Sequence, residues 1–381
     1  TRRSLFLTGK AGTGKSTFLR YISETTKKKH VILAPTGIAA INAGGSTLHS
    51  FFKLPFHPLL PNDTRYNVRN MRKTLRYTSE KCKLLREVEL IIIDEISMVR
   101  ADIIDFIDKV LRVYNRNMRE PFGGKQLLLV GDIYQLEPVV REEDRQLLAP
   151  FYHSQFFFDA KVFASLQLVS IELTKVYRQN SPTFINLLDH IRSSHVTTAD
   201  LEMLNRQVGA DIDTSDSSLS ITLSTRRDTV DYINSTRLAE LDGDATIFDG
   251  TIEGDFPENN LPSPLKLELK VGAQVLFVRN DKEKRWVNGT LGTVTGFSLD
   301  VEDSKDAIIY VRTEDGVEFD VEQEIWSNIK YTFNEKEQKI EESVLGTFCQ
   351  FPLRLAWAIT VHKSQGLTFR NVKIDFSGGG F

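Results

Sequence analysis

The sequence predicts an α/β fold built on parallel sheets, with a small antiparallel barrel inserted toward the carboxyl end. Three observations support this prediction. A glycine-rich loop at 9–16 lies between a short apolar run and a helical pattern. Apolar runs at 90–93 and 126–130 end in polar residues, as buried parallel strands do. Before the α/β pattern resumes, short alternating strands are expected at 265–269, 274–278, 292–297 and 308–312.

The composition is that of an ordinary globular protein. The chain has 381 residues, 41% of them hydrophobic and 26% charged, with a net charge of −3. No apolar run approaches the ~18 residues of a membrane span, no signal peptide is recognisable, and two cysteines form no disulfide framework. We therefore expect a reducing compartment: the cytoplasm or nucleoid of a bacterium, or the nucleus or mitochondrion of a eukaryote.

The glycine-rich loop has the full G-x-x-x-x-G-K-[ST] pattern, from Gly9 to Ser16. Its backbone N–H groups, the following helix N-terminus and the lysine amine suit the phosphates of a nucleotide, and its serine hydroxyl suits Mg²⁺. A dinucleotide fingerprint is excluded because Thr17 occupies the position of its third glycine. The expected nucleotide contacts in this loop are Gly12, Thr13, Gly14, Lys15, Ser16 and Thr17.

Two later strand ends supply the remaining groups of a hydrolytic site. Asp94 and Glu95 follow the apolar run 90–93, where the first carboxylate would hold Mg²⁺ and the second would activate a water molecule. Gln135 follows the run 126–130 and could hydrogen-bond a γ-phosphate or the attacking water. Solvated acids and an ordinary loop glutamine are the alternative interpretations of these two stretches.

Nucleic-acid contacts must come from local patches, because the net charge is slightly negative. The stretch 53–86 carries nine Lys or Arg and two acids, a charge of +7, and its prolines mark an insertion outside the sheet. Small and hydroxyl residues at 35–52 follow the strand 31–34, and His-Lys-Ser-Gln-Gly ends an expected apolar helix within 355–369. Both stretches suit phosphate and sugar contacts.

Other elements are expected in chain order. They are an amphipathic helix at 102–114, a strand of a second sheet at 168–173, a helix from Pro182 and a linker at 242–264. Arg178, between that strand and that helix, is a candidate arginine finger.

Seven motifs in this order resemble those of a superfamily 1 DNA helicase, most closely the Pif (petite integration frequency) family, a relative of RecD. They are 9–17, 34–42, 45–52, 94–97, 102–124 with the following Gly-Asp-x-x-Gln-Leu-x-Pro, 173–179 and 355–369. The resemblance implies two RecA-like P-loop domains, a wedge insertion and an SH3-like barrel. It also implies 5′-to-3′ movement on single-stranded DNA, driven by ATP with Mg²⁺.

Carried over residue by residue, the resemblance assigns Mg·ATP binding to Lys15, Ser16 and Asp94. It makes Glu95 the base, Gln135 the γ-phosphate sensor and Arg178 the finger. It also implies that single-stranded DNA lies along seven residues: Pro35, Thr36, Asn42, Thr47, His49, His362 and Lys363. Tailed or forked duplexes and G-quadruplexes are further candidate partners, and we expect a monomer that does not contact membranes.

The resemblance implies four domains. The first RecA-like domain takes 1–52 and 81–160, the wedge 53–80, the second RecA-like domain 161–240 and 347–381, and the linker and barrel 241–346. The family's adenine-reading glutamine and last arginine motif would fall beyond the two ends, so we expect a fragment of a longer chain. A P-loop kinase and a single-strand-binding protein with a vestigial ATP site remain as alternatives.

Overall fold

The computed structural model describes residues 3–55, 57–177, 181–210, 219–258, 261–298, 307–377 and 379. The chain forms two compact units, and each is described by itself. The first unit comprises Thr1–Asn180 and Asn328–Leu345, and the second comprises Ser181–Ser327 and Gly346–Phe381. The late segment 328–345 thus belongs to the first unit.

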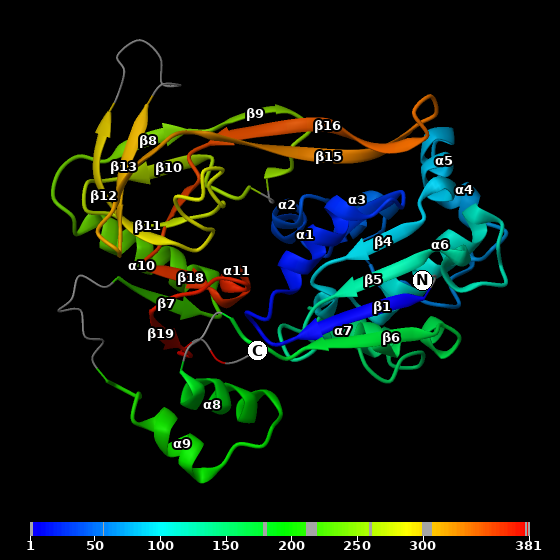
Figure 1. Cartoon of the computed structure of the whole chain (residues 1–381), viewed down its shortest axis with the longest axis horizontal. Helices are drawn as coiled ribbons and strands as arrows, with labels where there is room; N and C mark the ends of the chain where they lie inside the picture. The colour runs from blue at the N-terminus through cyan, green and yellow to red at the C-terminus, as the bar shows by residue number, and fades with distance from the viewer. Residues whose placement is uncertain are drawn as a thin grey trace. The chain divides into compact units, whose positions relative to one another are not determined.

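The first unit is built on a six-stranded sheet in the order β3-β2-β4-β5-β1-β6 (Figure 1). Each strand is parallel to its neighbours. The strands are β1 (Ser4–Gly9), β2 (His30–Ala34), β3 (Ser46–Thr47), β4 (Leu90–Ile93), β5 (Gln126–Val130) and β6 (Leu168–Leu173). Because all six are parallel, their carboxyl ends meet at one edge of the sheet.

Both faces of this sheet are buried, which explains why its strands are continuous apolar runs. In β4, Ile91 and Ile93 belong to one core cluster, and Leu90 and Ile92 to another on the opposite face. Leu19 of the helix after β1 packs on the second face. The helices of this unit are α1 (Lys15–Thr25), α2 (Gly37–Ala43), α3 (Leu48–Phe52), α4 (Met71–Leu75), α5 (Ser79–Glu87), α6 (Ala101–Asn115) and α7 (Glu142–Leu148).

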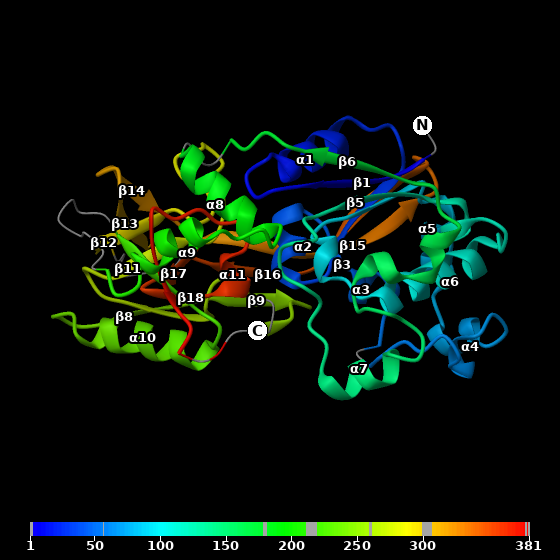
Figure 2. The ribbon, with the colours of Figure 1, turned by 90° about the horizontal axis from the view of Figure 1, so that it is seen from below.

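The basic insertion is tied to α6. Figure 2 shows its helix α4 on the side of α6 that faces away from the sheet. Tyr66 and Met71 of the insertion are buried in the first core, where the Tyr66 ring meets Phe106 of α6 edge-on at 5.0 Å. Arg72 donates from Nη2 to the Val113 carbonyl at 2.9 Å. The insertion is therefore a packed part of the first unit.

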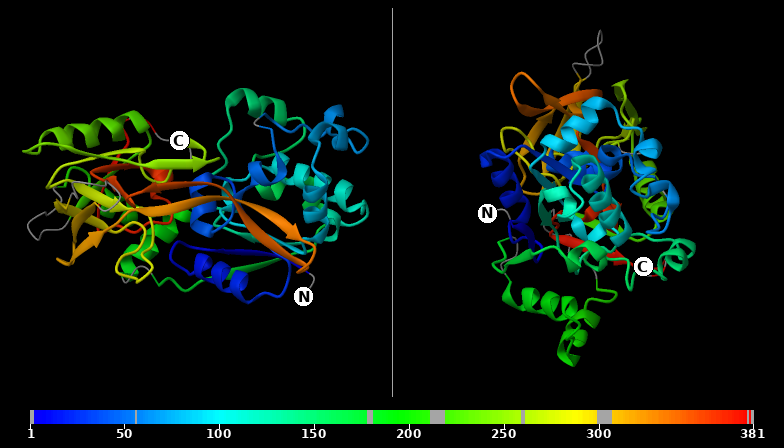
Figure 3. Two further views of the ribbon diagram at one scale, coloured as in Figure 1. Left: turned by 90° about the horizontal axis from the view of Figure 1, so that it is seen from above. Right: turned by 90° about the vertical axis from the view of Figure 1, so that its right-hand side faces the viewer.

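A long hairpin was not predicted. It consists of β15 (Glu324–Asn334) and β16 (Lys339–Gln350), seen together in Figure 3. Its tip packs on the first core through Ile329, Phe333 and Ile340. The Tyr331 hydroxyl accepts the N–H of Ile32 in β2 at 3.3 Å, so the tip contacts the sheet backbone directly.

The second unit contains a three-stranded parallel sheet and an antiparallel barrel-like part. The parallel sheet has the order β18-β7-β19, and α10 (Arg227–Ala239) packs on it. A five-stranded sheet in the order β14-β13-β12-β11-β17 is antiparallel throughout. The remaining elements are α8 (Pro182–Arg192), α9 (Thr198–Asn205), β7 (Ser220–Ser224), β8 (Thr246–Asp249), β9 (Thr251–Gly254), β10 (Lys266–Leu269), β11 (Gln274–Phe277), β12 (Leu291–Ser298), β13 (Ile308–Thr313), β14 (Glu318–Val321), β17 (Leu353–Leu355), β18 (Ala358–Thr360), α11 (Val361–Ser364) and β19 (Asn371–Asp375).

Three expectations about elements were wrong. The strand 168–173 is not part of a second sheet: it pairs with β1 from Ser4↔Leu168 to Gly9↔Leu173. The stretch 242–264 is not only a linker, since it contains β8 and β9. The apolar part of 355–369 is strand β18 rather than a helix, and only α11 follows it. None of the described helices is long and apolar enough to cross a membrane.

Candidate functional site

The phosphate loop links the carboxyl end of β1 to α1. Gly9, Gly12 and Gly14 have φ values of 147°, 76° and 93°, backbone angles that residues with a side chain rarely adopt. A Cβ at Gly9 would also lie 2.5 Å from the Leu173 carbonyl oxygen of β6. The glycines therefore permit both the turn and the close contact with the edge strand.

Polar side chains hold the loop from within. Lys15 donates from Nζ to the carbonyls of Gly9 at 2.6 Å and Lys10 at 2.9 Å. Thr13 is buried and donates from its hydroxyl to the Lys10 carbonyl at 2.8 Å. Ser16 and Thr17 open α1 with exposed side chains. The lysine amine thus braces the loop from inside, and the serine side chain is exposed at the start of α1.

Asp94 and Glu95 follow β4 at the same edge of the sheet. Burial raises the pKa of both carboxyl groups; for Glu95 the charges of Asp94 and Asp132 add to the effect, and the pKa rises to about 7. The ammonium group of Lys15 opposes the increase at both carboxyls, which places the lysine within electrostatic reach of the pair. The Glu95 N–H donates to Asp94 Oδ1 at 3.0 Å.

Gln135 lies in the loop that follows β5, and Asp132 organises that loop. The Tyr134 N–H donates to Asp132 Oδ1 at 3.1 Å, and the Gln135 N–H donates to the Asp132 carbonyl at 3.0 Å. Asp132 is buried and raises the pKa of Glu95, so the two loops are coupled electrostatically. Asp132 was not predicted as a site residue, although it follows the apolar strand β5 after a single glycine, much as Asp94 follows β4.

These groups fit a nucleotide triphosphate with Mg²⁺. The loop offers glycine N–H groups and a helix N-terminus for phosphate oxygens, and Lys15 offers a positive charge. Ser16 and Asp94 would supply oxygen ligands to the metal, which keeps most of its waters in such sites. In the described residues, no group of three or more His, Cys, Asp or Glu could hold a metal on its own.

In the first unit, the residues predicted to contact single-stranded DNA follow strands β2 and β3. Thr36 caps α2 by accepting the Ala39 N–H at 3.2 Å, and Thr47 caps α3 by accepting the Ser50 N–H at 3.1 Å. Thr36 and Asn42 are exposed, while Pro35 and Thr47 are half-buried. The segments after β2 and after β3 therefore begin at the same edge of the sheet as the phosphate loop, because these strands are parallel to β1.

His49 of α3 is linked to a buried ion pair. Burial and the charge of Arg100 lower its pKa, and Asp102 opposes this effect. Arg100 donates from Nη2 to Asp102 Oδ2 at 2.7 Å, and that oxygen also accepts the Leu59 N–H of the insertion at 2.9 Å. Asp102 therefore connects α6 with the start of the basic insertion beside α3.

Three of the predicted site residues are not among those that the structure describes at this edge of the first sheet. His362 and Lys363 belong to α11 of the second unit, and both side chains are exposed. Arg178, the predicted finger, lies outside the described residues.

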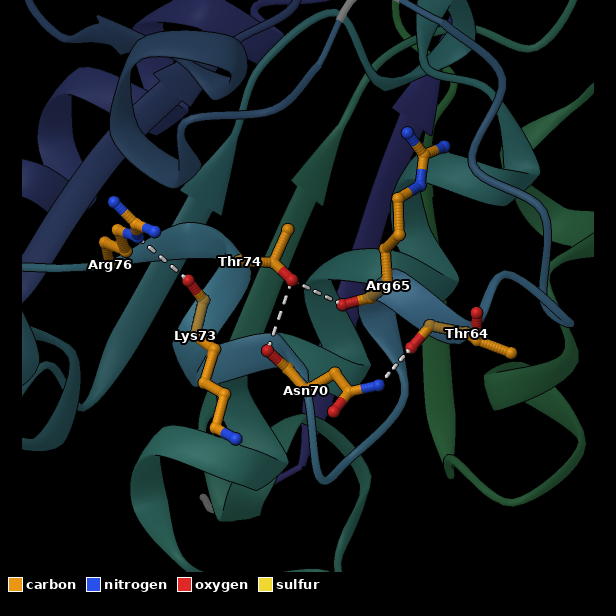
Figure 4. A pocket seen from close by; sticks show the side chains of 6 residues that line it. All are labelled: Thr64, Arg65, Asn70, Lys73, Thr74 and Arg76. Carbon is orange, nitrogen blue, oxygen red and sulfur yellow. Dashed lines mark hydrogen bonds between the residues drawn. The ribbon is translucent and has the colours of Figure 1, made fainter.

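The basic insertion contains a pocket of about 590 Å³. Two of its lining side chains are bonded to the backbone: the Thr74 hydroxyl donates to the Arg65 carbonyl at 2.7 Å, and the Asn70 amide donates to the Thr64 carbonyl at 2.9 Å. Figure 4 shows the cationic ends of Arg65, Lys73 and Arg76 pointing to different sides, so they do not converge on one ligand. The pocket is lined by Thr64, Arg65, Asn70, Lys73, Thr74 and Arg76.

Similarity to known proteins agrees with this arrangement. Residues 1–202 match the family PIF1-like helicase, and residues 257–297 match the 2B domain of the DNA helicase Pif1. The ATP-dependent DNA helicase Pif1 of Bdellovibrio bacteriovorus is 33% identical over 98% of this chain and 78% of its own. The human ATP-dependent DNA helicase PIF1 is 34% identical over 98% of this chain, which spans only 54% of the human protein.

Solved structures show the same likeness. A Pif1 of Bacteroides sp. in complex with ADP-AlF4 is 42% identical, with a TM-score of 0.87 over 98% of this chain and 82% of its own. Bacteroides Pif1 bound to ssDNA has a TM-score of 0.63 at 42% identity, over 98% of this chain and 83% of its own. The predicted family and fold class are confirmed, and the named relatives are ATP-dependent DNA helicases. The chain belongs to the PIF1-like helicase family.

Proposed function

We propose that this chain is an ATP-dependent DNA helicase that moves along single-stranded DNA, 5′ to 3′, and separates duplexes. The observation that carries the proposal is one sheet edge where a phosphate loop, a buried carboxylate pair and a glutamine loop meet. A water-activating base beside a phosphate loop is what triphosphate hydrolysis requires.

In this proposal the chain's own groups divide the work of hydrolysis. Lys15 and the loop N–H groups bind the phosphates, and Glu95 takes a proton from the water that attacks the γ-phosphorus as the bond to ADP breaks. Gln135 holds that water or a γ-phosphate oxygen. Mg²⁺, held by Ser16 and Asp94, would neutralise charge on the phosphates.

A pKa of about 7 suits Glu95 to this role. A base is most effective when its pKa is near the working pH, because it is then both ionised and basic enough to accept the proton. Arg178 would stabilise charge on the departing γ-phosphoryl group, a contribution of about 10³–10⁵ in rate in related enzymes.

Each unit offers its own candidate contacts to the single strand. The first offers Pro35, Thr36, Asn42, Thr47 and His49, and the second offers His362 and Lys363. Bacteroides Pif1 has been solved bound to ssDNA, and a structure of two coordinating Pif1 helicases at forked dsDNA extends the partners to forks. We propose that the chain acts as a monomer in a DNA-containing compartment, with tailed or forked duplexes and G-quadruplexes as substrates.

The proposal is tested by ATP hydrolysis with and without a single-stranded oligonucleotide, and by unwinding of duplexes that carry either a 5′ or a 3′ tail. We expect stimulation by the oligonucleotide and separation of the 5′-tailed duplex only. Release of free phosphate distinguishes a helicase from a kinase, which would phosphorylate a small molecule instead. Binding of DNA without hydrolysis, unchanged by Glu95→Gln, would instead indicate a vestigial nucleotide site.

A further inference from the structure

Three lysines from separate segments of the first unit gather beside α3. Lys53 follows α3, Lys81 lies in α5, and Lys330 lies in β15 of the hairpin. The Lys81 amine lies over the ring of Phe51, two residues before Lys53, and the ring of Tyr331, next to Lys330, lies edge-on to the same Phe51 ring. The charges of Lys53 and Lys330 both act on the Lys81 amine. We call this group the three-lysine cluster.

Lys81 lies in an unusual environment for a lysine. The Lys81 Nζ lies over the ring of Phe51, a residue of α3, at 3.3 Å from the ring centroid. Burial and the two neighbouring ammonium groups lower the pKa of Lys81 to about 7. The lysine is thus held between an aromatic ring and two like charges.

No acidic side chain among the described residues forms an ion pair with any lysine of the cluster. Two other lysines of this unit are different: Lys83, also in α5, pairs with Glu335, and Lys29, just before β2, pairs with Glu87 at 2.7 Å. Like charges that gather without a carboxylate repel one another. A bound anion would relieve this repulsion, and the part of the chain that the structure describes pairs no carboxylate with these amines.

The hairpin is anchored so that Lys330 reaches the cluster. Tyr331 is buried against β2, and its ring lies 6.2 Å from the Phe51 ring in an edge-on arrangement. Adjacent residues of a strand point to opposite faces, so Lys330 is directed away from the core and is exposed. The cluster is therefore an arrangement built by the fold, with one lysine supplied by an insertion late in the chain.

We propose that Lys53, Lys81 and Lys330 form a binding site for a backbone phosphate of single-stranded nucleic acid, continuing the contacts of α3. The inference rests on the proposed function. Thr47 and His49 lie at the start of α3 and Lys53 at its end, a helix about 7.5 Å long. The site recognises phosphate rather than a base, because the Lys81 amine covers the Phe51 ring that a base would need for stacking.

The test is the salt dependence of binding to a fluorescent single-stranded oligonucleotide, measured without nucleotide for the parent chain, Lys53→Ala and Lys330→Ala. Each lost phosphate contact should lower the slope of log K against log salt by about 0.7 and weaken binding about fivefold at 0.1 M salt. Lys336→Ala is the control, because Lys336 is exposed in the same hairpin outside the cluster. Lys81→Met keeps the apolar stem over Phe51 and should resemble the alanine variants.

The outcomes separate the inference from the proposed function. If the parent chain binds no oligonucleotide and shows no stimulated hydrolysis, the proposed function fails and the inference with it. If the parent chain binds but Lys53→Ala and Lys330→Ala keep its slope, only the inference is overturned. The inference is also overturned if Lys53→Ala and Lys330→Ala weaken binding to a blunt duplex and not to a single strand. The same holds if Lys336→Ala weakens binding to the single strand as much as these two variants do.

Discussion

Replacing Glu95 with glutamine should abolish turnover and at the same time stabilise the protein. The carboxyl group is largely buried next to Asp94, with Asp132 adding further negative charge. Glutamine has the same shape, carries no charge and cannot accept the proton of water. Loss of a general base typically lowers the rate by about 10²–10⁴.

The gain in stability follows from the pKa of Glu95. Between its ordinary value of 4.5 and about 7, the unfolded chain ionises while the folded chain keeps the proton. The folded state therefore loses stability as the pH rises through this range. At 1.36 kcal/mol for each pH unit, the loss reaches about 3 kcal/mol above pH 7. The Glu95→Gln variant has no such loss.

The measurement is thermal unfolding of both proteins at pH 5 and pH 8 without nucleotide. We expect a small advantage of Glu95→Gln at pH 5, where about 1 kcal/mol of the loss is already present, and at pH 8 a midpoint that is higher by roughly 4–8 °C. Glu268→Gln serves as the control, because Glu268 is an exposed residue on β10. Its midpoint should equal that of the parent chain at both pH values.

Two results would contradict this reasoning. Equal midpoints of Glu95→Gln and the parent at pH 8 would show that Glu95 is ionised at little cost, so that burial beside Asp94 does not raise its pKa. A Glu95→Gln protein that hydrolyses ATP at the parental rate would remove Glu95 from the chemistry.

Three further substitutions test the scaffold of the site. Asp102→Asn should destabilise the chain by about 3–5 kcal/mol in denaturant unfolding, because Arg100 stays buried without its partner; a loss under 1 kcal/mol would disprove this. Gly9→Ala should abolish binding of a fluorescent ATP analogue, because its Cβ would meet the Leu173 carbonyl oxygen at 2.5 Å; retained affinity would contradict it. Tyr331→Phe should cost about 1 kcal/mol through the lost hydrogen bond to β2, and an unchanged unfolding midpoint would show that this bond is worth nothing.

The position of the nucleotide site could be predicted because buried parallel strands are easy to recognise. Ile91, Ile92 and Ile93 are fully buried on two faces, so the strand is an unbroken apolar run, and polar residues after it must lie at the sheet edge. The same logic put Gln135 after the run 126–130, whereas the phosphate loop was recognised from its own G-x-x-x-x-G-K-[ST] pattern. The roles of the individual residues and the four-domain division remain predictions.

Pairing between distant strands could not be predicted in the same way. The strand 168–173 looks the same whether it joins the first sheet or a second one, and its actual partner is decided by a register that brings Leu173 against Gly9. The run around Ala358–Thr360 is too short to distinguish a strand from a buried helix by periodicity. In both cases the deciding contacts are far away in the sequence.

The hairpin shows what such distant contacts add to function. Its strands alternate in the sequence, but nothing local indicates that Tyr331 will bond to the backbone of β2. Strand β2 ends just before Pro35 and Thr36, so the hairpin tip supports the strand from which the first predicted DNA contacts emerge. The same tip supplies Lys330 to the cluster at the end of α3. The resemblance placed this segment in the linker and barrel, yet its tip supports β2 and supplies a lysine beside α3 in the first unit.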